Sequence, residues 1–121
     1  MPQPEDRALA VMLRTEKVLR AVELVPRGQV VAFGQLGAVV GVGARQVGQV
    51  LANHGRAVAW WRVVSASGGL PAHLLPEARA HWHVEGIALR RDGNGCRIAD
   101  HGCDLDALAA AWQEAAADLE R

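Results

Sequence analysis

The residues best suited to chemistry lie in one short segment, residues 59–64, which reads Ala-Trp-Trp-Arg-Val-Val. Trp60 and Trp61 place two large aromatic rings next to the guanidinium group of Arg62. Covalent group transfer needs an activated nucleophile such as a thiolate, and a tryptophan has none to offer. An indole ring instead presents a large, flat, apolar surface. The segment therefore predicts contact with a flat group rather than a covalent reaction.

The histidines and the remaining candidate ligands match no metal or cofactor site. His81 and His83 are two residues apart, so on a helix they point to different faces. Cys96, His101 and Cys103 are close in sequence, but their spacings match no zinc motif. The chain contains no Walker sequence and no complete dinucleotide-binding glycine loop. We therefore expect no catalytic metal and no cofactor.

Further motifs surround the tryptophan segment in a fixed order. Residues 25–36 read Val-Pro-Arg-Gly-Gln-Val-Val-Ala-Phe-Gly-Gln-Leu, and residues 43–48 read Gly-Ala-Arg-Gln-Val-Gly. Asn53 and the pair Glu85-Gly86 complete the set. In order and spacing these motifs resemble the C-terminal domain of the O6-alkylguanine-DNA alkyltransferases, over roughly residues 10–90. The ordered set is far more specific than any one of its members.

Within this resemblance, Trp60 stands where the enzymes carry the cysteine that accepts the alkyl group. The non-enzymatic alkyltransferase-like proteins also have tryptophan there, usually in the form Pro-Trp-His-Arg. The resemblance implies a protein that binds O6-alkylguanine in duplex DNA through the minor groove and flips the damaged base into a pocket. It would leave the alkyl group in place and flag the lesion for nucleotide excision repair proteins. Base flipping is the general solution when a base must be inspected outside the stack.

Two residues depart from the pattern of these relatives. Ala59 replaces the proline, and Trp61 replaces the histidine that even the non-catalytic relatives usually keep. Loss of the histidine is expected to remove a polar group that links the pocket to Glu85. We also expect Trp61 to be at least half buried.

The expected DNA-binding residues lie on the second helix of a helix-turn-helix and at the start of its first helix. They are Phe33, Ala44, Arg45, Gln46, Gly48 and Gln49. Small outward residues permit close backbone approach, which suits the narrow minor groove. Arg45 stands at the family's arginine finger and would fill the space that the extruded base leaves. Phe33 replaces the family's tyrosine and lacks its hydroxyl group.

The expected lesion pocket is formed by residues 59–71. Its predicted lining is Trp60, Trp61, Val63, Ser65 and Leu70. Asn53, Arg62 and Glu85 are expected to support it. In the family the asparagine holds the active-site turn, while Arg62 can tie neighbouring elements through its five donors. Glu85 has lost its two partners of the enzymes' Cys-His-Glu relay and would remain as a structural acceptor.

These side chains require a mainly helical domain with short β elements. Helices are predicted at residues 4–23, 33–40, 44–53, 76–86 and 104–119, and extended pieces at 29–32 and 62–65. The two helices around Gly41-Val42-Gly43 form a helix-turn-helix at about residues 33–53. Residues 87–91 and 96–99 look like a hairpin. We expect one winged helix-turn-helix-like domain over residues 1–121.

The first and last helices carry further local signals. Pro4 and Glu5 suit the start of the first helix, and Asp104 can cap the last one. The first helix also has an apolar face with helical spacing, which predicts burial. That face consists of Leu9, Met12, Leu13, Val18, Leu19 and Val22.

Composition and charge limit the class of protein. Of 121 residues, 50% are hydrophobic and 21% charged, which is typical of a globular domain. No apolar run reaches the ~18 residues of a membrane span, and the N-terminus does not resemble a signal peptide. A cytoplasmic location with no membrane partner is therefore expected, as is a monomer. The net charge of +0 argues against indiscriminate binding of nucleic acid.

Charge is unevenly distributed along the chain. No Asp or Glu occurs between Leu24 and Pro76, whereas Arg27, Arg45, Arg56 and Arg62 do. A phosphate backbone would meet such a stretch favourably. Two other functions stay open at this point. One is a transcriptional regulator that uses only the helix-turn-helix, and the other is a degenerate alkyltransferase that uses one of the two cysteines.

Overall fold

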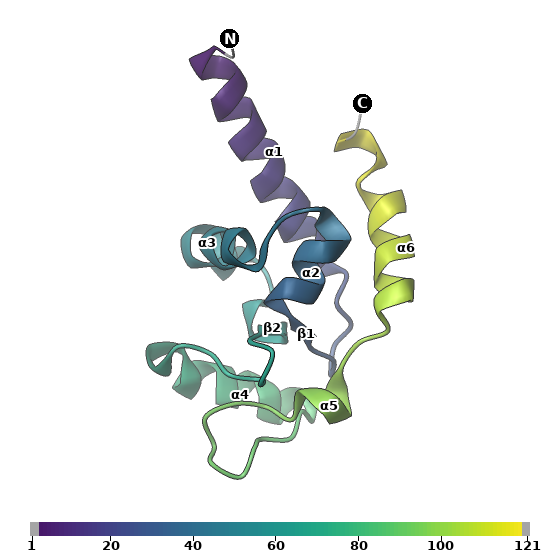
Figure 1. Ribbon diagram of the computed structural model, residues 1–121. Coiled ribbons are helices and arrows are strands. Elements are labelled where there is room, and N and C mark those ends of the chain that lie inside the picture. Colours follow the sequence, from purple (N-terminus) through teal and green to yellow (C-terminus); the bar gives the residue numbers. More distant parts are fainter. Residues whose placement is uncertain (1–2, 120–121) are drawn as a thin grey trace.

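The computed structural model describes residues 3–119, which form helices around a small parallel sheet (Figure 1). The α-helices are α1 (Pro4–Glu23), α2 (Phe33–Val40), α3 (Ala44–His54), α4 (Leu75–Glu85), α5 (Ile98–His101) and α6 (Leu105–Ala115). The strands are β1 (Val31–Ala32) and β2 (Val63–Val64). Short 3₁₀ helices are η1 (Gly55–Ala57), η2 (Trp60–Arg62), η3 (Ala72–Leu74) and η4 (Ala117–Leu119). The predicted fold class, mainly helical with short β elements, is confirmed.

The sheet joins the helix-turn-helix to the tryptophan segment. β1 and β2 pair in parallel, with Val31 opposite Val63 and Ala32 opposite Val64. All of these residues are buried, and β-branched side chains suit strands that are covered on both faces. β1 leads directly into α2, and β2 directly follows η2. The pairing therefore places the start of the helix-turn-helix beside the tryptophans.

α2 and α3 form the predicted helix-turn-helix, with α3 one residue longer than expected. α2 ends at Gly41, whose φ of 96° lies in the left-handed region that glycine tolerates. Gly37 lets the turn close tightly on α2, because a Cβ atom there would lie 2.5 Å from the carbonyl oxygen of Val42. These two glycines fix the angle at which α3 leaves the turn.

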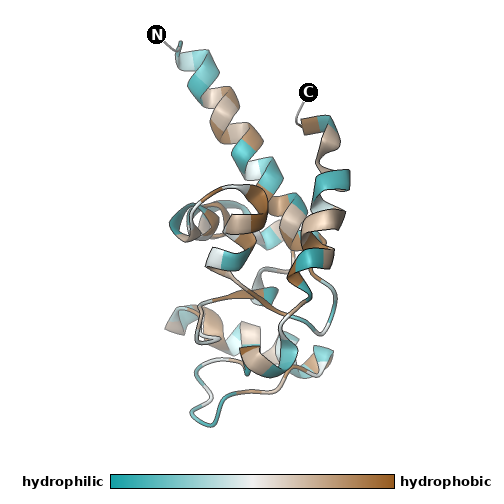
Figure 2. Ribbon diagram, turned by 45° about the vertical axis from the view of Figure 1, so that its right-hand side comes forward, coloured by the Kyte–Doolittle hydropathy of each residue, from teal (hydrophilic) through white to brown (hydrophobic). Residues whose placement is uncertain are grey.

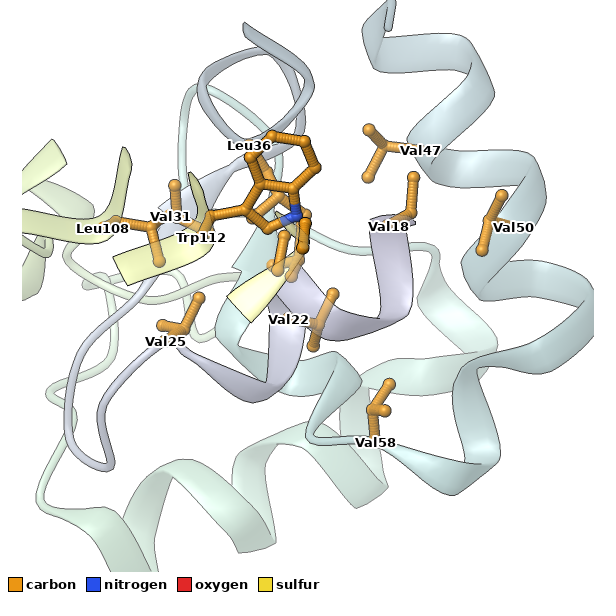
Figure 3. Close-up of a cluster of buried hydrophobic side chains, with 13 residues drawn as sticks. Val18, Val22, Val25, Val31, Leu36, Val47, Val50, Val58, Leu108 and Trp112 are labelled. Carbon is orange, nitrogen blue, oxygen red and sulfur yellow. The ribbon is translucent and has the colours of Figure 1, made fainter. Parts of the chain in front are cut away.

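One buried cluster holds the helix-turn-helix against the first and last long helices (Figure 3). Its buried members are Val18, Ala21, Val22, Val25, Val31, Leu36, Val47, Val50, Val58, Val63, Leu108, Trp112 and Ala116. Full burial of a side chain of this size contributes about 1.5–3 kcal/mol. The cluster leaves the opposite face of α3 free to meet a partner.

The prediction for the N-terminal half of α1 is wrong. Leu9 is 54% exposed and Met12 is 67% exposed, although both belong to the predicted buried face. Figures 1 and 2 show the reason, since this half of α1 extends away from α2 and α3. The face becomes buried only at Val18 and Val22. Helical periodicity identified the correct face but not how far the core reaches along it.

The predicted hairpin is only partly present. Leu89 and Cys96 form one antiparallel bridge, but residues 98–101 are helical (α5) rather than extended. The N–H of Cys96 donates to the carbonyl oxygen of Gly68 at 2.9 Å. Cys96 is therefore hydrogen-bonded to the turn after β2 as well as bridged to Leu89. Gly68 is required there, because a Cβ atom would lie 2.0 Å from the Cys96 oxygen.

The last helix begins as predicted and ends earlier than predicted. Asp104 accepts a hydrogen bond from the N–H of Ala107 at 3.0 Å, which is the expected N-cap. α6 ends at Ala115, and residues 117–119 form the 3₁₀ helix η4. Arg20 of α1 donates to the carbonyl oxygen of Ala115 at 2.8 Å and pairs with Asp118. These contacts hold the C-terminal helices against α1.

Candidate functional site

A pocket of about 330 Å³ lies between α3, η2 and the chain that follows β2. It is lined by Phe33, Gly48, Leu51, Ala52, Gly55, Arg56, Trp60, Val63, Leu70, Pro71, His73 and Leu74. Trp60 forms part of its wall and is 8% exposed. The lining is largely apolar, as is common for sites that take a flat organic ring.

Of the five predicted lining residues, Trp60, Val63 and Leu70 line this pocket. Trp61 and Ser65 do not, so the prediction for these two is wrong. Ser65 lines a neighbouring, more open cavity of about 740 Å³, and its Oγ accepts the N–H of Gly69 at 2.9 Å. That hydrogen bond shapes the turn that closes the pocket.

Trp61 is turned toward α4 instead. Its ring stacks on the imidazole of His81, with centroids 3.6 Å apart and planes at 4°. Its Nε1 donates to Glu85 Oε2 at 2.8 Å. The expected loss of a polar link to Glu85 is therefore also wrong, because the indole N–H provides one. Trp60 meets Trp61 edge to face, at 5.8 Å between centroids, so the link reaches the pocket wall.

Glu85 is the acceptor at the centre of this support. Its carboxylate receives Arg62 Nε at 3.0 Å, Arg62 Nη2 at 2.9 Å and the N–H of Gly28 at 2.9 Å, besides Trp61. The side chain of Glu85 is only 4% exposed. Burial raises the pKa of this carboxyl, but the hydrogen bonds from Arg62, Gly28 and Trp61 outweigh that effect and hold the pKa below its ordinary value. Glu85 stays ionised and ties η2 to α4.

Arg62 also holds the tryptophan turn η2 in place. Besides its two bonds to Glu85, its Nη1 donates to the carbonyl oxygen of Val25 at 3.0 Å. It thus connects the end of α1 to the tryptophan turn, as predicted from its donor geometry. Asn53 is different: its side chain is exposed and makes no hydrogen bond to any of residues 3–119. The support expected from Asn53 is not seen.

Most of the predicted DNA-binding residues on α3 lie on its exposed face. Gln46 has a different role. Ala44, Arg45 and Gln49 are exposed on α3, and Gly48 lines the pocket beneath them. Gln46 caps the helix instead, since its Oε1 accepts the N–H of Gly43 at 3.1 Å. The exposed face of α3 is therefore small and carries one cation.

Phe33 lies at the N-terminus of α2 and lines both cavities. It is half-buried and packs against the main core cluster. Its ring separates the pocket beneath α3 from the open cavity that Ser65 lines.

The arginines of the acid-free stretch are not equivalent. Arg62 is paired with Glu85, and Arg56 is paired with Glu77 at 2.8 Å. Arg27 donates to the carbonyl oxygen of Val84 at 3.3 Å. Among residues 3–119, Arg45 makes no ion pair or hydrogen bond. The expected positive stretch is therefore reduced, since carboxylates neutralise Arg56 and Arg62, whereas Arg27 and Arg45 have no carboxylate partner within residues 3–119.

Sequence reasoning missed several lining residues. Leu51 and Ala52 follow Gly48 at helical spacing, which is the signal that could have identified them. Gly55 lies beside Trp60, and a Cβ atom there would meet that of Trp60 at 3.5 Å, an ordinary van der Waals distance. Arg56 and His73 lie in short turns, where no periodic pattern points to a pocket.

Neither cysteine of the chain lines this pocket. Cys96 is buried in the cluster below Trp60, and Cys103 lines the open cavity. Burial raises the pKa of both thiols, which disfavours the reactive thiolate. Within the described residues no group of three potential metal ligands is found. The described helices also include none that is long and apolar enough to span a bilayer.

This geometry can be compared with known families. A profile of the family "6-O-methylguanine DNA methyltransferase, DNA binding domain" matches residues 14–91, more than half of the chain. The chain belongs to this family. The match includes the helix-turn-helix, the tryptophan segment and Glu85, which are the parts that form the pocket and its support. No curated protein sequence matches the chain.

One solved structure has a fold similar to that of this chain. It is the crystal structure of S. pombe Atl1 in complex with damaged DNA containing O6-carboxymethylguanine. The TM-score is 0.65 at 23% identity, over 86% of this chain and 99% of the other. At this identity the similarity establishes the common fold. The family profile ends before α5 and α6, so α6, which packs on α1, lies outside it.

Proposed function

We propose that this methyltransferase-family domain binds O6-alkylguanine in duplex DNA, extrudes the damaged base into the pocket beside Trp60 and leaves the alkyl group in place. The observation that carries the proposal is the pocket itself. It opens beside the exposed face of α3, and Trp60 stands in its wall. The resemblance of the sequence implies that this is the position of the family's alkyl-acceptor cysteine. Its volume of about 330 Å³ lies at the lower end of sites for small organic ligands, about 300–1,000 Å³.

The face of α3 supports an approach through the minor groove. Ala44, Gly48 and Ala52 keep this face shallow, so the helix backbone can come close to the sugar edges. Arg45 is exposed at the N-terminal end of α3 and makes no ion pair or hydrogen bond within residues 3–119. Its planar guanidinium would occupy the gap in the base stack. Extrusion costs on the order of a few kcal/mol, which contacts of this kind must offset.

The absence of a nucleophile at Trp60 supports recognition without repair. A stalled complex that keeps the base extruded and the alkyl group attached would mark the site for other proteins. We infer that nucleotide excision repair proteins are those partners and that the domain acts as a monomer. The arrangement also argues against a regulator that uses the helix-turn-helix alone, since a pocket beneath α3 has no role in reading an intact duplex.

A titration of matched duplexes tests this function. We expect tighter binding to a duplex with O6-methylguanine than to the same duplex with guanine, and intact mass spectrometry afterwards should show no methyl group on the protein. Arg45→Ala should weaken binding to the lesion duplex more than binding to the undamaged one. Equal affinity for the two duplexes, or a stoichiometric mass gain of the protein, contradicts the proposal. Equal weakening by Arg45→Ala would make this residue a phosphate contact only.

A further inference from the structure

The ionisable side chains that line the pocket are all potential cations. They are Arg56, on η1, and His73, on η3. No Asp or Glu is among the lining residues. The rest of the wall is aliphatic, aromatic or glycine, with Leu51, Trp60 and Leu70 as its larger members. A substituent that extends from an extruded base into this space would therefore meet positive charge and no negative charge in the wall.

Arg56 is held by a weak and incomplete pairing. Its Nη1 donates to both carboxylate oxygens of Glu77, at 2.8 and 3.0 Å. Its Nε and Nη2 make no hydrogen bond within residues 3–119. The side chains are 78% and 45% exposed, and an exposed pair of this kind contributes little to stability. The guanidinium can therefore exchange or share its carboxylate without disturbing the fold.

Glu77 itself lies outside the pocket lining. It lies in the first turn of α4 and pairs with Arg56 from outside the lining. The carboxylate of a bound ligand would approach Arg56 from the pocket side. Arginine binds carboxylates in a bidentate, charge-assisted manner, which neutral groups of the same size cannot reproduce.

We propose that Arg56 is a specificity-determining residue, which makes the pocket favour O6-alkylguanines that carry an anionic group, such as O6-carboxyalkyl adducts, over neutral adducts of equal size. This proposal rests on the proposed function, because it requires the damaged base to enter the pocket. Specificity would arise as a difference in affinity between two otherwise equal ligands. His73 provides a second hydrogen-bond donor at the same rim.

The test uses four duplexes of one sequence, with guanine, O6-methylguanine, O6-carboxymethylguanine or O6-carbamoylmethylguanine at the same position. The last two adducts have nearly the same size and differ in charge. The wild-type protein should bind the carboxymethyl duplex more tightly than the carbamoylmethyl duplex, by about two- to five-fold, the scale of an exposed ion pair. Arg56→Gln should remove that difference. Glu77→Gln should increase it, because the competing carboxylate is gone.

The outcomes separate the two proposals. Equal wild-type affinity for the carboxymethyl and carbamoylmethyl duplexes, with O6-methylguanine still preferred over guanine, overturns the charge selectivity and leaves the proposed function standing. A uniform weakening of all four duplexes by Arg56→Gln also overturns it, since Arg56 would then contact phosphate. If O6-methylguanine is not preferred over guanine in the wild-type protein, the proposed function fails. The thermal stability of both variants should match the wild type, because Arg56 is 78% exposed.

Discussion

At the residue scale, the support of the pocket depends on a hydrogen bond from Trp61 to Glu85. The indole N–H of Trp61, at the position where the resemblance of the sequence implies a histidine in the family, donates to Glu85 at 2.8 Å. The imidazole ring of His81 stacks on the indole ring of Trp61, with 3.6 Å between the ring centroids. Glu85 is thus hydrogen-bonded by Trp61 as well as by Arg62 and Gly28. Its role is to position η2, because a charge that is 4% exposed must be compensated by its neighbours.

Replacing Glu85 should therefore be costly. Glu85→Gln removes the charge that balances Arg62, whose side chain is 15% exposed, and we expect a loss of about 3 kcal/mol in the free energy of unfolding. Denaturant titration by circular dichroism measures this. Glu77→Gln is the matched control: it breaks a carboxylate–arginine pair at an exposed site and should cost less than about 1 kcal/mol. Similar losses in the two variants would contradict a central role for Glu85.

Glu85 should also make the free energy of unfolding depend on pH. The pKa of Glu85 is lowered in the folded protein, so its contribution to stability is complete above the ordinary glutamate pKa and is lost as pH falls through the folded value. Unfolding free energies should therefore drop more steeply below about pH 4.5 in the wild-type protein than in Glu85→Gln. Parallel curves for the two proteins would show that Glu85 titrates normally.

At the element scale, the boundaries of the helix-turn-helix could be predicted from local sequence signals. The hairpin and the direction of the Trp61 ring could not. The ends of α2 and α3 depend on glycines and caps within the segment, so the helix-turn-helix was predictable as residues 33–53, one residue short of the end of α3. The hairpin depended on what residues 96–99 would pair with, and Cys96 bonds to Gly68, far away in sequence. Trp61 was expected in the pocket because of its position in the motif, but the direction of its ring depends on α4.

Helix α1 shows the same limit and allows a direct comparison within one element. Val18 is fully buried, and Val18→Ala should cost about 2 kcal/mol through lost contacts and a cavity. Met12 lies on the same predicted face but is 67% exposed, and Met12→Gln should change stability by less than about 0.5 kcal/mol. Chemical denaturation of both variants measures the difference. Comparable losses would mean that the N-terminal half of α1 is packed in solution.

At the scale of the whole molecule, charge and shape favour selective binding over general affinity for DNA. The net charge is +0, and two of the arginines of the acid-free stretch are paired with glutamates. A phosphate backbone therefore gains little from the surface as a whole. What distinguishes this surface is the shallow face of α3, the exposed Arg45, which has no partner within residues 3–119, and a pocket directly beneath them. Selectivity should consequently depend on the pocket.

The most direct measurement is the ratio of the dissociation constants for a guanine duplex and an O6-methylguanine duplex, in the wild-type protein and in Trp60→Leu. Leucine retains apolar bulk at this 8% exposed position while it removes the flat ring. Contact between a base and an aromatic ring is worth about 1–3 kcal/mol, so we predict that the ratio falls by about 5- to 150-fold. Circular dichroism should show a folded variant. An unchanged ratio in a folded Trp60→Leu protein would contradict the account, because the damaged base would then not meet Trp60.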